Sequence, residues 1–321
     1  MSCPHIIFMV YDSRSGSTLL SRILAERLKD VAVTPEIGFD SLLKQRSTSF
    51  SREHARAIVR KLYASGDFRN IGVKPSELEA KISTMTEPIS KAALIRLALL
   101  QWQVASGMAG SKIIVKNGTH ALYWRQITAM MNGAARFIFV YRDPRAVINS
   151  KLRTIRPYHK HEVMAWGGPL LAALQWLRYS SIMRNATKAG IEVLDVQYES
   201  LLHFTEREVT RVAEFLDTQV MSEKQGVNYI IPEVERNIHT GVLSGEMKTE
   251  RGKAWVRELS IFDRNVIDSL CMSEMLYRGY APVGRHGKVF ATLCIIAALP
   301  GTLLKVARHF SFLFVKHATR V

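Results

Sequence analysis

His5-Ile-Ile-Phe-Met-Val-Tyr-Asp-Ser-Arg-Ser-Gly-Ser-Thr18 is the stretch of sequence that decides the fold. Residues 5–12 begin with an apolar run, and a short apolar run that ends at turn residues is typical of a buried strand. A turn rich in Ser and Gly at 13–17 leads into a helical pattern over 18–29. Strand, turn and helix together predict a βα unit. The N-terminus of this helix would direct backbone N–H groups and the positive end of its dipole toward an anion.

The alternation of strand and helix continues along the chain. Further strands are predicted at 113–116, 136–141 and 191–196. Helical patterns lie at 89–105, 121–131, 144–155, 170–189, 206–216 and 261–277. This alternation is typical of a parallel sheet with helices on both faces. We therefore predict one α/β domain over residues 1–280, followed by a tail over residues 281–321 that differs in composition.

The composition is that of a globular protein with a strongly basic balance. Hydrophobic residues make up 47% and charged residues 22% of the 321 residues, which excludes a disordered chain. Lys and Arg number 44 against 28 Asp and Glu, so the formal net charge is +16. This charge attracts phosphorylated ligands and anionic lipid surfaces. No nucleic-acid recognition motif accompanies it, so we expect no nucleic-acid partner.

The cysteines and the N-terminal residues indicate a cytoplasmic protein. Three scattered cysteines without paired spacing exclude a disulfide scaffold and a cysteine zinc site: Cys3, Cys271 and Cys294. They fit a reducing compartment. The residues before the first strand are too few for a signal peptide. We therefore expect a cytoplasmic location.

The tail combines positive charge with an apolar segment. No acidic residue follows Glu274, whereas basic residues recur to the end: Arg278, Arg285, Lys288, Lys305, Arg308, Lys316 and Arg320. Residues 289–304 are uncharged and mostly apolar, but Pro300-Gly301 interrupts them, and a membrane crossing needs about 20 such residues. We expect 285–321 to contact the cytosolic face of an anionic membrane, either in its interface or as a short hairpin. The alternative is a C-terminal helix packed on the core.

The turn Ser13-Arg-Ser-Gly-Ser-Thr18 has the residue types of an anion site. Gly16 lets the backbone approach an anion closely, and Ser15, Ser17 and Thr18 offer hydroxyl donors. Arg14 adds charge and a planar fork of N–H groups. The turn differs from the nucleotide P-loop G-x-x-x-x-G-K-[ST], because it lacks the first Gly and the Lys. This difference argues against a kinase or NTPase.

A second anion motif is Tyr141-Arg-Asp-Pro-Arg-Ala-Val-Ile-Asn-Ser150. Arg142 ends a predicted strand, and open α/β sheets bind ligands at the carboxyl ends of their strands. Asp143 suits a helix N-cap and Pro144 the first helical turn. Ser150 lies about two turns along the helix that follows. Arg142 and Ser150 are therefore placed to hold one phosphate.

The two motifs together resemble those of the sulfotransferase family, whose donor is 3′-phosphoadenosine-5′-phosphosulfate (PAPS). The first loop is similar to the Arg-Ser-Gly-Ser-Thr form found in carbohydrate-type and bacterial members. Gln197-Tyr-Glu-Ser-Leu-Leu202 resembles the family's Tyr-Glu-Asp-Leu segment, with Ser200 in place of the usual Asp. Arg251-Gly-Lys-Ala-Trp255 resembles the loop that closes over the nucleotide. The resemblance covers about residues 5–280 and implies a P-loop-like parallel sheet flanked by helices.

The resemblance also implies a role for each matching residue. Arg14 would contact the 5′-phosphosulfate and its bridging oxygen, and the rest of the loop would hold the 5′-phosphate: Ser15, Gly16, Ser17 and Thr18. Arg142 and Ser150 would hold the 3′-phosphate. Tyr198 would lie beside the adenine, and Arg251 and Gly252 would close on the 3′-phosphate. The family requires no metal, and the sequence shows no cluster of metal ligands.

Two residues compete for the role of general base. Glu36, in Val33-Thr-Pro-Glu-Ile37, follows the first helix, where carbohydrate-type and bacterial members often place a catalytic glutamate. His120, in Lys116-Asn-Gly-Thr-His120, resembles the Lys-Thr-His of cytosolic arylsulfotransferases, with two residues inserted. A histidine titrates near neutral pH, whereas a glutamate would need a raised pKa. We favour Glu36 because of the loop type. Lys116 ends a strand and is a candidate contact of the sulfuryl group.

These residues predict a sulfotransferase that moves a sulfuryl group from PAPS to a hydroxyl group, rather than an amine, of a carbohydrate or lipid-linked glycan. The glutamate-type site and the basic apolar tail favour that acceptor. Two alternatives are a P-loop kinase or NTPase and a non-catalytic anion- or membrane-binding protein with this fold. His159 and His161 would border the acceptor rather than bind a metal.

Overall fold

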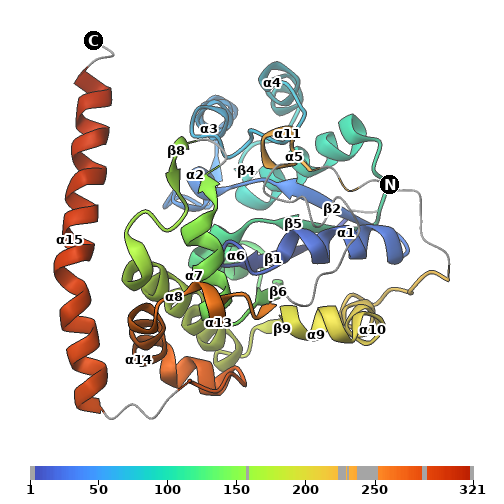
Figure 1. Cartoon of the computed structure of the whole chain (residues 1–321). Helices are drawn as coiled ribbons and strands as arrows, with labels where there is room; N and C mark the ends of the chain where they lie inside the picture. Colours follow the sequence, from blue (N-terminus) through green and yellow to red (C-terminus); the bar gives the residue numbers. More distant parts are fainter. Residues whose placement is uncertain are drawn as a thin grey trace. The chain divides into compact units, whose positions relative to one another are not determined.

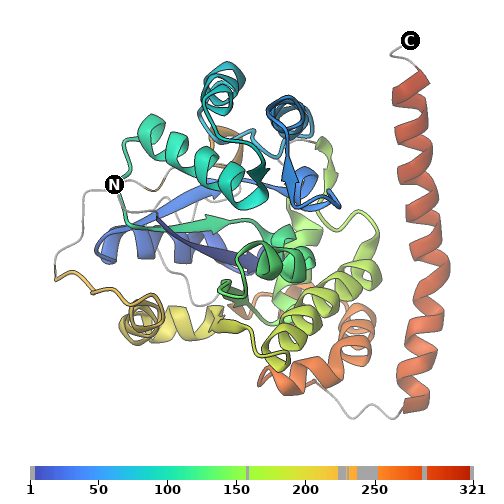
Figure 2. The ribbon, with the colours of Figure 1, turned by 180° about the vertical axis from the view of Figure 1, so that it is seen from behind.

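The computed structural model describes residues 4–156, 159–222, 229, 231–236, 252–283 and 288–318. The chain folds into two compact units, each built from several segments. Figures 1 and 2 show the helices and strands from opposite sides. The first unit comprises residues 1–11, 16–140 and 182–233. The second comprises residues 12–15, 141–181 and 234–321. The predicted division into residues 1–280 and 281–321 remains a prediction.

A five-stranded sheet forms the centre of the first unit. Its strand order is β2-β5-β1-β6-β9, and the pairs β1–β5, β1–β6 and β2–β5 are parallel. The strands are β1 (His5–Tyr11), β2 (Val31–Glu36), β5 (Lys112–Lys116), β6 (Arg136–Tyr141) and β9 (Glu192–Gln197). The predicted parallel sheet is therefore confirmed, with β2 as an additional edge strand.

Strand β1 is apolar along most of its length because it lies at the centre of the sheet. Residues Ile6 to Val10 are each at most 7% exposed, as expected for a strand with neighbours on both sides and helices on both faces. The parallel strands end at one edge of the sheet, so Tyr11, Glu36 and Lys116 finish there together. Glu36 pairs directly with Lys116 in the register of β2 and β5.

Helices surround this sheet, and the predicted ones are confirmed to within a few residues. They are α1 (Ser17–Arg27), α2 (Asp40–Leu43), α3 (Arg52–Ala64), α4 (Pro75–Ser83), α5 (Lys91–Ser106), the 3₁₀ helix η1 (Gly118–Tyr123), α6 (Trp124–Met130), α9 (Tyr198–His203) and α10 (Thr205–Phe215). The two-residue strands β3 (Ser49–Phe50) and β4 (Ile89–Ser90) form an antiparallel pair.

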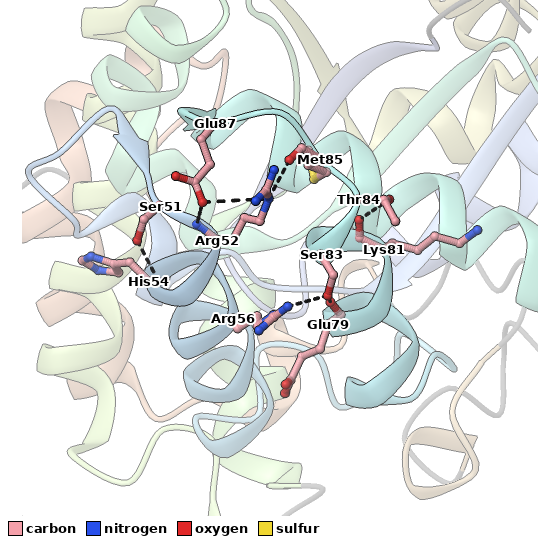
Figure 3. A network of polar contacts seen from close by, with 10 residues as sticks. All are labelled: Ser51, Arg52, His54, Arg56, Glu79, Lys81, Ser83, Thr84, Met85 and Glu87. Atoms are coloured by element: carbon pink, nitrogen blue, oxygen red, sulfur yellow. Dashed lines mark hydrogen bonds and ion pairs between the residues drawn. The ribbon is translucent and has the colours of Figure 1, made fainter.

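Polar contacts join α3 to α4 and to the segment that follows α4 (Figure 3). The backbone N–H of Arg52 donates to the Glu87 carboxylate at 2.8 Å, and its Nε donates to the Met85 carbonyl at 2.9 Å. Arg56 donates to the Ser83 hydroxyl. The bonds of Arg52 link the start of α3, just after β3, to the residues just before β4.

The second unit is mainly helical. Its elements are α7 (Pro144–Arg153), β7 (Ile155–Arg156), β8 (His159–Val163), the start of α8 (Gly168–Lys188), α13 (Trp255–Glu258), α14 (Ile261–Tyr277) and α15 (Lys288–Ala318). The short helix α11 (Glu233–Arg236) spans the point in the sequence where the first unit ends and the second resumes. Its core packs Val147, Trp176, Trp255, Ile267 and Met275. The predicted helices at 144–155, 170–189 and 261–277 are confirmed.

The tail forms one continuous helix, α15, of 31 residues. Pro300 lies inside it, so the expected interruption and the alternative of a short hairpin are wrong. Cys294 is buried against Leu170 and Val266, which docks one face of α15 on the second unit. Residues Phe290–Ala307 are long and apolar enough to cross a membrane by length and composition, and 11% of them are buried. The helix therefore has one packed face and an exposed apolar face.

Candidate functional site

The first half of the anion loop belongs to the second unit and has a constrained backbone. The Ser15 N–H donates to the Asp12 carbonyl at 3.2 Å, which closes a tight turn. Within this turn Arg14 has a φ of 72°, in the left-handed region that residues with a Cβ avoid. Such strain concentrates at functional sites, where the surroundings impose it. The turn thus fixes the direction of the Arg14 side chain.

The Arg14 side chain reaches the second anion motif. Its Nε donates to the Ser150 hydroxyl at 3.0 Å, across 136 positions of sequence. Arg142, 8% exposed, donates from a guanidinium nitrogen to the Arg14 carbonyl at 3.4 Å. The structure therefore brings together Arg14, Arg142 and Ser150, and their roles toward the donor remain predictions. Beside them the buried Ser15 hydroxyl has no hydrogen-bond partner.

Helix α7 holds Arg142 and Ser150 in place. Asp143 caps the helix as predicted, since its carboxylate accepts from the Arg145 N–H at 2.8 Å. Pro144 occupies the first turn. The Trp176 indole donates to the Arg142 carbonyl at 3.0 Å. These contacts fix the end of β6 and the start of α7.

A buried ion pair that sequence analysis missed fastens the loop to α7. Both Asp12 oxygens accept from Lys151 Nζ at 2.6 Å, and the two side chains are 3% and 2% exposed. Gln175 donates to the same carboxylate at 2.9 Å. Burial raises the pKa of Asp12, and the attraction of Lys151 opposes this rise. The available signal was positional, because Asp12 precedes the loop and Lys151 follows Ser150.

The second half of the loop belongs to the first unit, where Gly16 has a φ of 95°. A Cβ at Gly16 would lie 2.2 Å from Cδ2 of Tyr198, so the Tyr198 ring packs directly on this glycine. Ser17 and Thr18, both buried, form the first turn of α1. The structure therefore brings Tyr198 to the loop, and its place beside the adenine remains a prediction.

Glu36 and Lys116 gather with two further residues at the carboxyl edge of the sheet. Lys116, 3% exposed, donates from Nζ to the Thr18 hydroxyl at 3.0 Å. The Tyr11 hydroxyl, which sequence analysis missed, donates to Glu36 Oε2 at 2.9 Å. Lys116 Nζ also lies 5.9 Å from the centre of the Tyr11 ring and 5.6 Å from that of Tyr229. An exposed carboxylate and a buried cation thus lie at the ends of adjacent strands.

His120 lies in the core, apart from that edge cluster. Its exposed fraction is 0%, and its ring packs against Phe8 and Phe39. Its Nε2 accepts from the Phe39 N–H at 3.2 Å, which holds the backbone three residues beyond Glu36. Burial lowers the pKa of His120 to about 3. This environment suits a neutral histidine that positions the chain after β2.

The remaining predicted residues are less informative. Arg251 lies outside the described residues, as do the side chains of His159 and His161. Gly252 begins the turn before α13, and a Cβ there would meet open space. Among the residues that the structure describes, no group of three or more His, Cys, Asp or Glu is placed to hold a metal ion.

The sequence and the fold both resemble those of known sulfotransferases. Residues 5–223 match the family model described as the sulfotransferase family. No curated protein matches the chain. A sulfotransferase domain from the curacin biosynthetic pathway has a TM-score of 0.57 at 16% identity, covering 88% of this chain and 100% of that one.

Two further solved structures have lower scores. The sulfotransferase domain of the Synechococcus PCC 7002 olefin synthase has a TM-score of 0.50 at 17% identity, covering 88% of this chain and 97% of that one. Sulfotransferase STF9 from Mycobacterium avium has a TM-score of 0.45 at 12% identity, covering 89% of this chain and 79% of that one. The curacin-pathway likeness confirms the P-loop-like α/β fold.

Proposed function

The chain belongs to the sulfotransferase family, and we propose that it transfers a sulfuryl group from PAPS to a hydroxyl group of a carbohydrate or lipid-linked glycan. One observation carries the proposal for the donor. The Arg14–Ser150 hydrogen bond joins the two anion motifs, which are far apart in sequence. Neither motif alone distinguishes a phosphate site from a capped helix. Their junction supports a site for a donor with more than one phosphate.

The donor set in each unit suits the groups that PAPS presents. In the second unit two guanidinium groups and two hydroxyls lie together, those of Arg14, Arg142, Ser15 and Ser150. Guanidinium groups bind phosphate through paired N–H groups, and the unpartnered Ser15 hydroxyl is a further donor. Gly16 follows Ser15 in the chain and leads into α1, whose N-terminus favours an anion. We assign the 5′-phosphosulfate to this loop and the 3′-phosphate to Arg142 and Ser150.

The reaction needs charge stabilisation and removal of one proton. The acceptor oxygen attacks sulfur and forms a new S–O bond, while the bond from sulfur to the 5′-phosphate oxygen breaks. The electron pair of that bond leaves with 3′-phosphoadenosine-5′-phosphate (PAP). Arg14 and Lys116 are the cations assigned to the negative charge that develops, a role in which fixed charges are most effective. The acceptor's proton passes to a base.

Glu36 is the residue that we assign as this base. Its carboxylate is exposed at the strand end, so an acceptor hydroxyl can approach it. The Tyr11 hydroxyl orients one carboxylate oxygen. His120 is the weaker candidate, because it is fully buried and its Nε2 already accepts from Phe39. His120 thus positions the chain near Glu36 in our account.

The exposed apolar face of α15 supports the choice of a lipid-linked acceptor. Leu293, Ile296 and Leu303 are each more than half exposed. Basic residues flank them in sequence, including Lys288 and Lys305. An apolar face with basic flanks binds an anionic membrane interface. We propose that α15 holds the enzyme at the cytosolic membrane face while its other side stays packed on the second unit.

Transfer of radioactive sulfur from PAPS tests the proposal. We expect labelled product with a glycan or glycolipid acceptor and no requirement for added Mg²⁺. Ser150→Ala and Arg142→Ala should raise the KM for PAPS, whereas Arg153→Ala, which changes an exposed arginine at the end of the same helix, should not. Turnover with ATP in place of PAPS would contradict the proposal.

A further inference from the structure

A pocket of about 800 Å³ lies in the first unit, and none of the residues assigned to the donor lines it. Three segments line it: the chain after α2, the start of α5, and the η1–α6 region. The first segment leaves the sheet after Glu36 of β2, and the third leaves it after Lys116 of β5. The first and third segments therefore both continue from strands that end at the carboxyl edge, where Glu36 and Lys116 lie.

Every charged residue that lines the pocket is positively charged. Lys44, Arg46 and Lys91 line the pocket, and no Asp or Glu does. Other polar groups face the same space, among them Tyr123, Gln126 and Asn132. The Asp40 carboxylate, which feels the charge of Lys44, is not part of the lining. The lining of the pocket therefore offers cations and hydrogen-bond donors and contains no carboxylate.

Lys91 is the most informative of these cations. It is 8% exposed, and its Nζ donates to the Gln45 carbonyl at 2.5 Å. An ammonium group has three N–H donors, and a buried cation is costly unless an anion is close. Among the described residues, no charged neighbour contributes to the pKa of Lys91. Burial lowers the pKa of Lys91, as expected for a cation that lacks a protein counter-ion.

The start of α5 adds to this positive potential. Ser90 caps the helix, since its hydroxyl accepts from the Ala93 N–H at 3.1 Å. Ser90, Lys91 and Ala92 all line the pocket, so the first turn of a 16-residue helix faces it. The positive end of the helix dipole and the Lys91 ammonium group act in the same direction.

Strand pairing and hydrogen bonds hold the walls of the pocket in place. Ser49 pairs with Ser90 across β3 and β4, and the Lys91 N–H donates to the Thr48 carbonyl at 3.1 Å. The network of Figure 3 ties Arg52, two residues after β3, to Glu87, two residues before β4. This rigid pairing keeps the Lys91 side chain beside the pocket, so binding need not order these segments.

We propose that this pocket binds an anionic group of the acceptor, a carboxylate, sulfate or phosphate, and so selects acceptors that already carry negative charge. The proposal rests on the proposed function only in naming the acceptor as the source of the anion. A free inorganic anion has the same chemistry, and the experiment distinguishes the two sources.

Binding is measured first, on the full chain saturated with PAP so that the donor site cannot take up phosphate. Inorganic phosphate is titrated while the amide NMR signals of Lys91, Ala92 and Tyr123 are followed. We expect saturable shifts at these amides. Lys91→Met should weaken phosphate binding at least tenfold, and Arg46→Gln should weaken it as well. The matched control is Lys61→Gln, an exposed lysine on α3 that does not line the pocket.

Several results would overturn the inference. Phosphate that shifts none of these amides in the unchanged protein would remove the anion site. Unaltered affinity in both Lys91→Met and Arg46→Gln would remove these cations from it. Because Arg46 is exposed, Arg46→Gln remains informative even where Lys91→Met fails to fold.

Turnover then identifies the source of the anion. Methyl glucuronide and methyl glucoside are compared as acceptors, since they differ in one carboxylate. We expect a lower KM for the glucuronide than for the glucoside, and we expect this difference in KM to be lost in Arg46→Gln. Phosphate binding without such a preference would overturn the acceptor assignment. Failure of PAP to bind the unchanged protein would instead overturn the proposed function.

Discussion

Arg14 combines an unfavourable backbone conformation with the contact that joins the two anion motifs. Its φ of 72° is one that glycine adopts without strain, yet the position carries a long charged side chain. The side chain reaches Ser150 from this conformation. The strain is thus associated with placement of the guanidinium group.

Replacing Arg14 should separate stability from donor binding. Arg14→Gly and Arg14→Ala both remove the guanidinium group, but only the glycine relieves the backbone strain. We expect Arg14→Gly to be more stable than Arg14→Ala by about 1 kcal/mol in urea unfolding. Both should bind PAP at least tenfold more weakly than the unchanged protein. Equal stability of the two variants would contradict the assignment of strain.

Glu36 and His120 should respond differently to conservative substitution. Glu36→Gln removes the base but keeps a group that can accept from Tyr11, so we expect kcat to fall by about 10²–10⁴-fold. Its affinity for PAP should not change. His120→Gln keeps an acceptor for the Phe39 N–H, and its kcat should fall far less. The opposite ranking of the two variants in a sulfur-transfer assay would make His120 the base.

Buried His120 should also make stability depend on pH. Its pKa in the folded protein is lowered to about 3, whereas an unfolded histidine titrates near about 6.5. Below pH of about 6.5 the unfolded chain binds a proton that the folded chain does not. The free energy of unfolding should therefore fall as the pH drops, by at most about 1.4 kcal/mol per unit from this one proton.

Urea unfolding at pH 7.5 and pH 5 measures this dependence. His120→Gln should lose part of the pH dependence that the unchanged protein shows. His54→Gln, which changes an exposed histidine on α3, should keep it. The same pH dependence in all three proteins would show that His120 is not buried in its neutral form.

At the scale of elements, local sequence patterns predicted four strands of the central sheet and missed the edge strand β2. The strands β1, β5 and β6 have uninterrupted apolar runs, which a buried parallel strand requires. Strand β2 contains Pro35, which lacks a backbone N–H and is tolerated only at a sheet edge or an irregularity. It has both, since it is the edge strand and its register shifts between Val33 and Glu36. The sequence analysis therefore predicted no strand at 31–36, and Glu36 ends one in the structure.

In the candidate site, contacts between residues far apart in the sequence could not be predicted. The motifs predicted Arg14, Arg142 and Ser150, because the spacing within each motif is local. The Asp12–Lys151 pair spans 139 positions, and the sequence shows only that each residue adjoins an anion motif, which does not establish that the two residues pair. Tyr11 was read only as the end of an apolar strand. Its hydroxyl bond to Glu36 depends on how β1, β5 and β2 stack across the sheet.

Helix α15 should bind membranes through its exposed apolar face. Ile296→Ser combined with Leu303→Ser removes apolar surface from that face, and we expect it to reduce sedimentation with anionic vesicles several-fold. Removal of residues 285–321 should abolish sedimentation. Vesicles of neutral lipid should bind the unchanged protein more weakly, since the flanking basic residues then have no counter-charge. Vesicle binding that is unchanged by either alteration would contradict the membrane assignment.

At the scale of the whole molecule, the net charge of +16 and the proposed donor are complementary. A protein of one charge sign attracts ligands of the other and accelerates their encounter, an effect that salt weakens. This attraction should increase the rate at which a donor with a phosphosulfate and a second phosphate encounters the protein. ATP with Mg²⁺ is also an anion, so charge alone does not distinguish PAPS from ATP. The distinction depends on Arg142 and Ser150, which we assign to the 3′-phosphate that ATP lacks.

Thermal unfolding with PAP, compared with ATP–Mg²⁺, tests this central assignment most directly. A ligand at 100 times its Kd adds about 2.7 kcal/mol to the free energy of unfolding, which is readily seen as a rise in Tm. We predict a rise with PAP that is lost in Arg142→Ala, and no rise with ATP–Mg²⁺. A rise with ATP–Mg²⁺ and none with PAP would contradict the account, because the two anion motifs would then form a site for a different nucleotide.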